Sequence, residues 1–270
     1  MTTLTEPRAF RRIAVLGGIY ANSHALGAAL ADIAGRDADA IFCLGDLGGF
    51  GPHPDRVVPL LRQAGVRVIQ GNYDQAIALG HDDCGCGYTD PRDNRFARIS
   101  YAYTLARTSS EHRRWLAALP GHRRLRLGER EALLCHGSPR AIAEFLWEST
   151  TPDGLVARLL DAARAELILC THSGIKWRRR LPDGRDLVNV GVIGRPENDG
   201  TPRVWYTLLT AEAGRDLAVD FVPVHYDHEA LAREMAAEGL PAEFVETVRT
   251  GWWTTCLEVL PGRERARGRF

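Results

Sequence analysis

The chain has 270 residues, and its 34 basic side chains balance its 34 acidic ones, so its net charge favours neither nucleic acid nor an anionic membrane as a partner. Apolar residues make up 45% and charged residues 25% of the chain, which is typical of globular proteins. No apolar run approaches the roughly 20 residues that span a bilayer, and the first residues lack the apolar core of a signal peptide. We therefore expect a cytoplasmic protein without nucleic-acid or membrane partners.

The N-terminal part of the chain predicts alternating strands and helices. Short apolar runs end in glycine, and stretches with apolar residues at helical spacing separate them. The expected elements are a strand at Arg12–Leu16, a helix at Ser23–Ile33, a strand at Ala40–Leu44, a helix at Pro54–Ala64 and a strand at Val66–Gln70. This order predicts βαβ units and a parallel sheet.

The middle of the chain is less regular. Residues 79–94 have the composition of a loop, and residues 95–119 have a helical pattern that Ser109 and Ser110 interrupt. Two short apolar runs around Gly128 predict a hairpin. A helix at Thr151–Arg164 and a strand at Glu166–Cys170 follow.

The C-terminal part predicts mostly strands and then helices. We expect a second, mostly antiparallel sheet from Lys176–Leu181, Leu187–Val190, Arg203–Leu209 and Leu217–Pro223. Helices at 227–238 and 242–250 should close the fold, and residues 261–270 are basic and should form a flexible, solvated tail. No linker is evident, so residues 1–270 should form a single domain.

Six cysteines occur, and they divide into two kinds. Cys43, Cys135 and Cys170 lie in or at the end of apolar runs, where cysteine behaves as a small hydrophobe. Cys84 and Cys86 form a C-x-C pair in a loop rich in glycine and aspartate. A zinc ribbon needs two cysteine pairs, so a turn feature or a local disulfide is favoured here, and redox-active thiols stay an alternative.

Polar residues follow four of the expected strands. The segments are GDLGGFGP at Gly45–Pro52, GNYD at Gly71–Asp74, CHGSP at Cys135–Pro139 and CTHSG at Cys170–Gly174. Carboxyl ends of strands followed by glycine-rich loops are where open α/β sheets bind ligands. Each polar residue alone would be an ordinary turn, capping or packed residue. Their joint placement at four strand ends predicts one common site.

The order of these segments resembles that of the calcineurin-like metallophosphoesterases, and the resemblance spans residues 13 to 224. Within that family, the wording of these segments is most similar to that of the small bacterial members. The resemblance implies a four-layer αββα sandwich of two mixed sheets, with metal ligands on the loops at the strand ends. It also implies hydrolysis of phosphate mono- or diesters with two metal ions.

The first family motif, D-x-H-G-N, is only partly present. It aligns with Gly18–Asn22, which reads GIYAN. Asn22 is kept, whereas Gly18 stands at the aspartate position and Tyr20 at the histidine position. The resemblance therefore implies that the private ligands of one metal site are missing. Tyr20 could instead contact substrate or pack, or rebuild part of that site together with His24.

The last family motif, G-H-x-H, aligns with Thr171–Gly174. It keeps the first histidine and replaces the second with Gly174, which is another ligand of the same lost site. The ligands of the other site are all present. They are Asp46, Asn72, His136 and His172. One carboxylate, one amide oxygen and two imidazoles suit one divalent transition metal such as Mn²⁺, Fe²⁺ or Zn²⁺. An inherited site that binds no metal is the competing interpretation.

The resemblance also suggests the remaining site residues. Tyr73 stands where the family has a histidine that is often treated as the general acid, and a phenol with a pKa of about 10 can donate a proton. Asp74 could orient Tyr73 or a water. Arg140 and Arg178 follow the histidine-containing segments and could bind an anion, since arginine suits phosphate.

Two further features lie near the expected site. The segment Asn189–Gly191 resembles the family's closing N-x-G-S sequence, with Val192 in place of the serine. We expect the substrate-binding residues to be Tyr20, Asn22, Arg140 and Arg178. Trp252 and Trp253 should pack the C-terminal helices onto the sheet or contact a second copy of the chain, so a homo-oligomer stays open.

Two functions follow. The first is a divergent metal-dependent phosphoesterase that retains one metal site, including the variant in which the remodelled site runs another reaction. The second is a non-catalytic pseudoenzyme that binds a small phosphorylated or anionic ligand, or a protein partner, in the old cleft. The complete set of ligands for one site favours the first.

Overall fold

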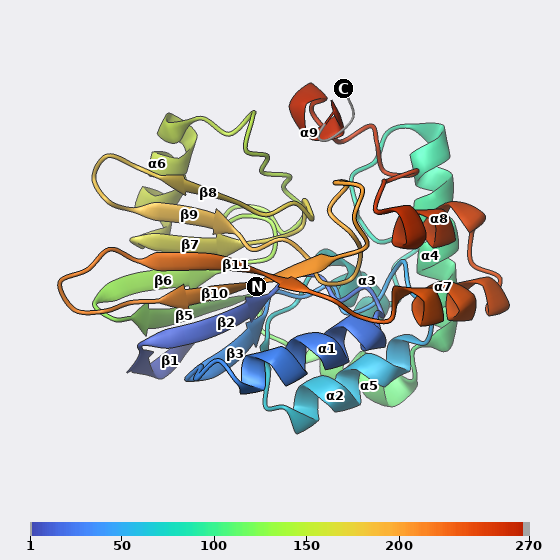
Figure 1. Ribbon diagram of the computed structural model, residues 1–270, viewed down its shortest axis with the longest axis horizontal. Coiled ribbons are helices and arrows are strands. Elements are labelled where there is room, and N and C mark those ends of the chain that lie inside the picture. The colour runs from blue at the N-terminus through green and yellow to red at the C-terminus, as the bar shows by residue number, and fades with distance from the viewer. Residues whose placement is uncertain (1, 267–270) are drawn as a thin grey trace.

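The computed structural model describes residues 2–266 and contains two β-sheets with helices around them (Figure 1). The larger sheet has six strands in the order β1-β5-β6-β7-β9-β8. Their bounds are β1 (Thr3–Phe10), β5 (His122–Leu127), β6 (Arg130–Leu134), β7 (Leu167–Cys170), β9 (Asp186–Asn189) and β8 (Trp177–Arg180). Strand β6 is antiparallel to β5, and β8 is antiparallel to β9, while the other neighbours are parallel.

The smaller sheet has five strands in the order β11-β10-β2-β3-β4. Their bounds are β11 (Ala218–Val224), β10 (Val204–Thr210), β2 (Arg12–Leu16), β3 (Ala40–Cys43) and β4 (Arg67–Val68). Strands β2, β3 and β4 are parallel, and β10 is antiparallel to both β2 and β11. Both sheets are mixed, which confirms the predicted α/β class.

Apolar side chains from both sheets form the core between them, among them Val15, Phe42, Leu134 and Leu169. The outer face of the smaller sheet packs against α1 (Ser23–Ala34), α2 (Val57–Gln63) and α3 (Asn72–Leu79). The outer face of the larger sheet packs against α6 (Asp153–Ala163). The layers are therefore helix, sheet, sheet and helix (Figure 1).

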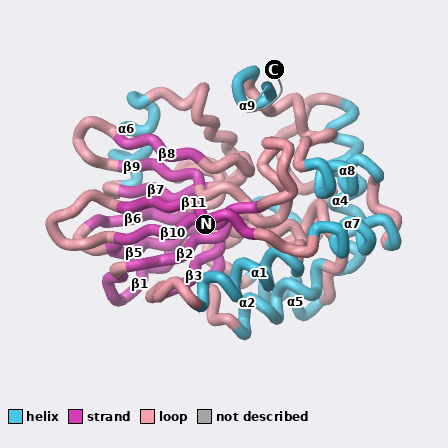
Figure 2. Tube along the Cα trace, viewed as in Figure 1, coloured by secondary structure: helices cyan, strands magenta, loops and turns pink. Residues whose placement is uncertain are grey.

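A helical cap lies beyond one end of the sheets. It consists of α4 (Pro91–Arg107), α7 (His228–Ala237) and α8 (Ala242–Thr250), which stand together on the right of Figure 2, apart from the strands on the left. Phe96 of α4 and Phe244 of α8 pack with Phe50 from the glycine-rich loop after β3. The cap therefore forms a wall beside that loop.

The expectation of one second, antiparallel sheet from the last four strands was wrong. Strands β8 and β9 belong to the larger sheet, because β9 pairs in parallel with β7. Strands β10 and β11 extend the smaller sheet, because β10 pairs with β2. A period-2 pattern predicts a strand and its buried face but carries no information about the strand beside it.

Strand β1 and helix α3 were absent from the sequence-based expectation. Strand β1 has an exposed surface and little apolar alternation, and it pairs in parallel with β5. Helix α3 begins at Asn72, and the side chain of Asp74 accepts from the backbone N–H of Gly71, as in a capping box. The helix thus starts inside the GNYD segment, which places that segment's side chains at a helix N-terminus.

Other boundaries differ in detail. Residues 54–64 divide into a 3₁₀ turn, η1 (Pro54–Arg56), and α2, and residues 95–119 divide into α4 and α5 (Ser110–Ala117). Within the expected tail, Gly262–Ala266 forms α9, where the buried Glu264 accepts hydrogen bonds from Ser149. Residues 267–270 lie outside the described part of the chain. Among the described residues, no helix combines the length and apolar character needed to cross a membrane.

Candidate metal centre

Four polar side chains meet at the edge where the strands of both sheets end. Asp46 follows β3, Asn72 opens α3 after β4, His136 follows β6, and His172 follows β7. All four are buried. Ligand atoms of Asp46, His136 and His172 lie within 4.8 Å of one another. We call these four residues the ligand wall.

Backbone geometry fixes the carboxylate of Asp46. The residue adopts a left-handed conformation with φ of 56°, and its Oδ1 accepts from the backbone N–H of Tyr73 at 3.0 Å. Gly71 allows this approach, since a Cβ there would lie 2.2 Å from Oδ1 of Asp46. Non-glycine residues at positive φ are uncommon and concentrate at functional sites.

The two histidines face each other across the ligand wall. Nδ1 of His136 lies 2.6 Å from the carbonyl oxygen of Leu44, and because a carbonyl only accepts, this nitrogen carries the proton. The other ring nitrogen, Nε2, lies 3.2 Å from both Oδ2 of Asp46 and Nδ1 of His172. A backbone acceptor behind the ring is the usual way to orient a metal-binding histidine.

The charges of the ligand wall are coupled. Burial opposes ionisation of Asp46, but His136 and His172 hold the pKa of its carboxyl below the ordinary value. Burial also opposes the charged form of His136, whereas Asp46 raises the pKa of that imidazole. Burial and the neighbouring His136 lower the pKa of His172 to about 3. His172 is therefore neutral and has a lone pair to offer.

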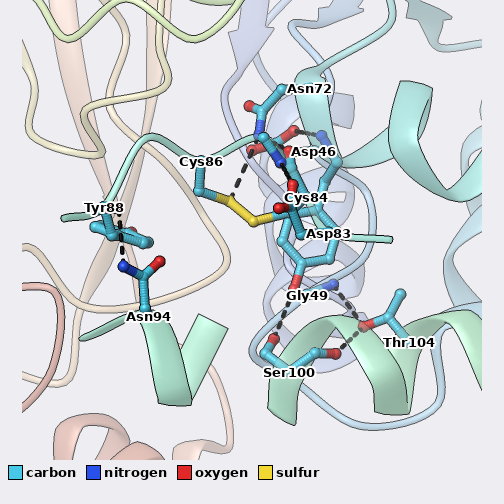
Figure 3. Close-up of a disulfide and its surroundings, with 12 residues drawn as sticks. Asp46, Gly49, Asn72, Asp83, Cys84, Cys86, Tyr88, Asn94, Ser100 and Thr104 are labelled. Carbon is cyan, nitrogen blue, oxygen red and sulfur yellow. Dashed lines mark hydrogen bonds between the residues drawn. A yellow bond between two sulfur atoms is a disulfide. The ribbon is translucent and has the colours of Figure 1, made fainter. Parts of the chain in front are cut away.

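Asn72 is held by a disulfide loop. Cys84 and Cys86 form a local disulfide, one of the two alternatives that the sequence favoured. The Nδ2 of Asn72 donates to the carbonyl oxygen of Cys84 at 2.8 Å and to Sγ of Cys86 at 3.6 Å, beside Asp46 (Figure 3). These contacts fix the amide, and its buried Oδ1 has no hydrogen-bond partner within residues 2–266.

The ligand wall fits a divalent cation. Buried polar atoms without a partner are rare in native structures and call for an explanation. One of them lies here among the described residues, Oδ1 of Asn72, and His172 presents Nδ1 to the same space, 3.2 Å from Nε2 of His136. A carboxylate, an amide oxygen and two imidazoles are a donor set for Mn²⁺, Fe²⁺ or Zn²⁺. Among residues 2–266, the group of Asp46, His136 and His172 is a buried cluster that could hold such an ion.

Tyr73 and Asp74 follow Asn72 in the first turn of α3. The ring of Tyr73 lines the cavity described below, and its hydroxyl donates to Oγ of Ser100 at 2.9 Å. Burial raises the pKa of Tyr73 well above its ordinary value. Asp74 accepts from the backbone N–H groups of Asp46 and Leu47 at 2.8 and 2.9 Å as well as from Gly71. Asp74 thus ties the glycine-rich loop to the start of α3.

Tyr20 and Asn22 follow β2 and have different surroundings. The ring of Tyr20 lies over Gly18 and Gly194, where an added Cβ atom at either position would come within 2.6 Å of it, and it lines the cavity. Burial, with Asp46 adding to it, raises the pKa of Tyr20 above its ordinary value. Asn22 caps α1, accepting from the N–H of Ala25 at 2.9 Å, so its side chain is engaged in the fold.

Arg140 and Arg178 lie away from the cavity. Arg140 pairs with Glu144 on the surface. Nε of Arg178 donates to Oδ1 of Asp186 at 2.8 Å, at the opposite end of β9 from the ligand wall. His24 contacts Glu234 of α7 at 3.2 Å. Neither arginine is among the residues that line the cavity.

A cavity of about 80 Å³ opens beside Asp46 and His172. Eight of its 19 lining residues are phenylalanine, tyrosine or tryptophan, and they come from the loops, α3, α4, α8 and the C-terminal segment. The rings belong to Tyr20, Phe50, Tyr73, Tyr88, Phe96, Phe145, Phe244 and Trp253. Arg195 also lines the cavity, and the sequence reasoning missed it. The available signal was its place four residues after the closing Asn189–Gly191 segment. We call Tyr20 and Trp253, together with the Arg195 side chain that lies over the ring of Trp253, the aromatic wall.

A second acidic group, Asp90, Asp93 and Glu258, is explained by the fold. Asp90 caps α4, and Asp93 accepts from the backbone N–H groups of Cys256 and Glu258 at 2.8 and 3.2 Å. Glu258 accepts from the N–H groups at the start of the same helix. These carboxylates therefore join the C-terminal segment to α4.

Comparison with known proteins agrees with this geometry. The profile described as the calcineurin-like phosphoesterase superfamily domain matches residues 12–214, which is most of the chain. With two mixed sheets and a buried Asp-His-His group at the strand ends, the protein has a metallophosphoesterase-like fold. The chain belongs to the calcineurin-like phosphoesterase superfamily.

Individual relatives cover nearly the whole chain. An uncharacterized protein of Methanocaldococcus jannaschii is 26% identical over 243 residues, which is 85% of this chain and 93% of that protein. The crystal structure of a metallophosphoesterase from Sphaerobacter thermophilus is 29% identical, has a TM-score of 0.70, and covers 90% of this chain and 99% of its own. A hypothetical protein from Pyrococcus horikoshii, 24% identical with a TM-score of 0.76, shares the fold over 92% of this chain and 100% of its own.

Proposed function

We propose that the protein is a hydrolase of small phosphate esters that uses one divalent transition metal, Mn²⁺, Fe²⁺ or Zn²⁺, held by the ligand wall. The observation that carries this proposal is the convergence of Asp46, His136 and His172 within 4.8 Å, beside the unpartnered amide oxygen of Asn72. The family consists typically of metal-dependent hydrolases, which supports the reaction class. The substrate is a small phosphorylated molecule.

The aromatic wall supports a single metal. In the family motifs, the other ion would need ligands at Gly18, Tyr20 and Gly174. Gly18 has no side chain, and the ring of Tyr20 fills the space that one would enter. The indole ring of Trp253 lies against Gly174, 3.5 Å from where its Cβ would be. Rings therefore stand where the private ligands of that ion would be.

The chain's own residues perform the remaining tasks in this proposal. A divalent ion in the ligand wall would polarise a phosphoryl oxygen and lower the pKa of a water. His136, held by the carbonyl of Leu44, presents Nε2 to the site, and the aromatic lining excludes bulk water. Asp74 positions Asp46 through its backbone N–H. Tyr73 is the candidate proton donor to the leaving group, and it has to release Ser100 to act.

A pseudoenzyme that binds an anion in the same cleft is the second candidate. The observation that favours it is the engagement of the hydroxyl of Tyr73 by Ser100, which leaves the leaving group without a free acid. The aromatic cavity would then serve to hold a ligand. Both candidates need the same pocket but differ in turnover.

Metal content and turnover test the proposal together. Elemental analysis of protein purified without chelator should find about one equivalent of a transition metal per chain, because the ligand wall supplies one donor set for one ion. His136→Ala should lose the metal, and His24→Ala, a histidine outside the cleft, should keep it. The loaded protein should hydrolyse p-nitrophenyl phosphate or its bis-ester.

The other outcomes distinguish the alternatives. One equivalent of metal without turnover on either ester would favour the pseudoenzyme. Two equivalents would contradict the single site. No metal, even after incubation with Mn²⁺ or Zn²⁺, would overturn the hydrolase.

A further inference from the structure

We propose that the guanidinium of Arg195 replaces the lost second metal ion as the cation that grips the phosphoryl group of the ligand. This inference rests on the proposed phosphate-ester chemistry. It assigns the anion-binding role to a residue outside all the metal-binding segments, and it names inorganic phosphate and phosphate esters as the ligands.

The backbone brings Arg195 to the altered half of the site. The N–H groups of Ile193 and Gly194 donate to the carbonyl oxygen of Gly18 at 3.1 and 2.9 Å. Gly18 is the position at which the family motif has a metal-binding aspartate. Arg195 follows directly, and its side chain lines the cavity together with Asp46 and His172. A positive charge therefore stands beside the place of a missing ligand.

Trp253 holds this charge in a defined orientation. The guanidinium carbon of Arg195 lies 3.5 Å from the centroid of the indole ring, in cation–π contact. The indole is itself fixed, because its Nε1 donates to the carbonyl of Pro196 at 2.7 Å and its backbone N–H donates to Oδ1 of Asn198 at 2.9 Å. The same ring lies against Gly174, the other altered ligand position. Stacking engages the face of a guanidinium and leaves its N–H edge available.

The charge of Arg195 lacks a counterion among the residues that the structure describes. Only 9% of the residue is exposed, and within the described part of the chain its buried Nε has no hydrogen-bond partner. Among residues 2–266, no carboxylate lies within ion-pair distance of it. Asp46 lines the same cavity, but its oxygens are engaged by His136 and the N–H of Tyr73. A buried, unpaired cation is unfavourable, and an anion in the cavity would relieve it.

The chemistry of the Arg195 guanidinium favours a phosphoryl group as the ligand. A guanidinium presents parallel N–H donors that match two oxygens of a phosphoryl group, and such charge-assisted pairs are stronger than neutral hydrogen bonds. Arg195 cannot activate a water as a metal can, so it would bind and orient while the ligand wall carries the chemistry. The site then has two cations of different kinds on the two sides of the phosphoryl group.

Phosphate binding by metal-free protein tests the role of Arg195 separately from turnover. We would titrate chelator-treated protein with inorganic phosphate and follow calorimetry together with tryptophan fluorescence, since Trp253 touches the guanidinium. Arg195→Met should weaken phosphate binding by about 10- to 100-fold, the loss expected for hydrogen bonds to a charged group. The phosphate affinity of Arg195→Lys should lie between those of the wild type and Arg195→Met, because lysine keeps the positive charge but lacks the two parallel N–H donors of a guanidinium.

Arg107→Met is the matched control. Arg107 also lies over an aromatic ring, that of Tyr103, but it is outside the cavity, and phosphate binding should not change. Thermal unfolding of each variant separates binding from folding. A purely structural Arg195 would show a lower melting temperature in Arg195→Met with unchanged phosphate affinity, and this result would overturn the proposal.

The remaining outcomes also test whether Arg195 binds the anion. If the wild-type protein does not bind phosphate, or if Arg195→Met binds it equally well, Arg195 is not the anion site. If Arg195→Met fails to fold, Arg195→Lys with unaltered affinity would overturn the proposal just as well. If phosphate binding depends on Arg195 but no metal is found, the hydrolase fails and this inference stands.

Discussion

The two walls of the cleft are built in different ways. Each residue of the ligand wall lies two or three residues after a strand or opens a helix, and backbone groups such as the carbonyl of Leu44 hold the wall in place. The aromatic wall combines segments that are far apart in sequence, since Tyr20 meets Gly194 and Trp253 meets Gly174. Strand ends are fixed by the sheets, whereas loops can be replaced without disturbing the core.

The two walls also differ in the charge of the ligand that would satisfy their unpaired groups. Among the described residues, the ligand wall contains an unpartnered polar atom that a cation would satisfy, Oδ1 of Asn72. The rings of the aromatic wall already fill the space around Gly18 and Gly174, and its one unsatisfied group is the cation of Arg195. One wall therefore calls for a positive ion and the other for an anion. Four predictions follow from this contrast.

The largest effect is expected from Asp46→Ala. Removal of the carboxylate takes the only formal negative charge out of the ligand wall, so metal affinity should fall by at least about 1000-fold, beyond the 10–100-fold typical of outer-shell changes. Metal retained after dialysis, measured by elemental analysis, checks this. Asp90→Ala, from the acidic group that the fold explains, should retain the metal. If Asp46→Ala retains as much metal as the wild type, the metal site lies outside the ligand wall.

Tyr73 stands between the two walls, and Tyr73→Phe tests to which of them it belongs. As a proton donor it should matter for a poor leaving group, so kcat for an alkyl phosphate should fall by about 100-fold. The rate for p-nitrophenyl phosphate, whose leaving group needs no proton, should change little. Ser100→Ala removes the hydrogen bond but keeps the phenol, and it should leave both rates intact. Equal losses on both substrates would exclude Tyr73 as the acid.

The packing of the aromatic wall predicts a coupling between Gly18 and Tyr20. Gly18→Ala places a Cβ within 2.6 Å of the ring of Tyr20, and overpacking of this kind costs about 1–3 kcal/mol in the free energy of unfolding. The same change in a Tyr20→Ala background should cost close to nothing, because the ring is gone. Denaturant unfolding of the four proteins gives the coupling energy. Additive effects would mean that the ring does not occupy this space.

The smallest effect concerns the disulfide loop behind Asn72. In a Cys84→Ser/Cys86→Ser variant the amide of Asn72 loses its contact with the sulfur but keeps the carbonyl of residue 84, so metal affinity should fall by about tenfold, the lower end for outer-shell groups. Reductant should weaken metal binding in the wild-type protein to a similar extent and have no effect on the variant. Sensitivity of the variant to reductant would point to another cysteine.

Local sequence signals were sufficient to predict most strands of this protein and the polar residues that follow them. Apolar runs that end in glycine predicted most strands and the polar residues behind them, because both signals act within a few residues. The structure brings Asp46, His136 and His172 together as neighbours, as their strand-end positions suggested. Strand partners were not determined in this way, and β10 and β11 joined the sheet of β2.

Only the tertiary structure decided which side chains share the cavity. Arg140 and Arg178 had favourable positions in the sequence, but Glu144 and Asp186 engage them elsewhere. Arg195 meets Trp253 across 58 positions of the chain, and neither residue lies in a motif with a known chemical role. Such contacts depend on how loops pack over the strand ends. Packing is a property of the whole fold, so no pattern within a short segment can reveal it.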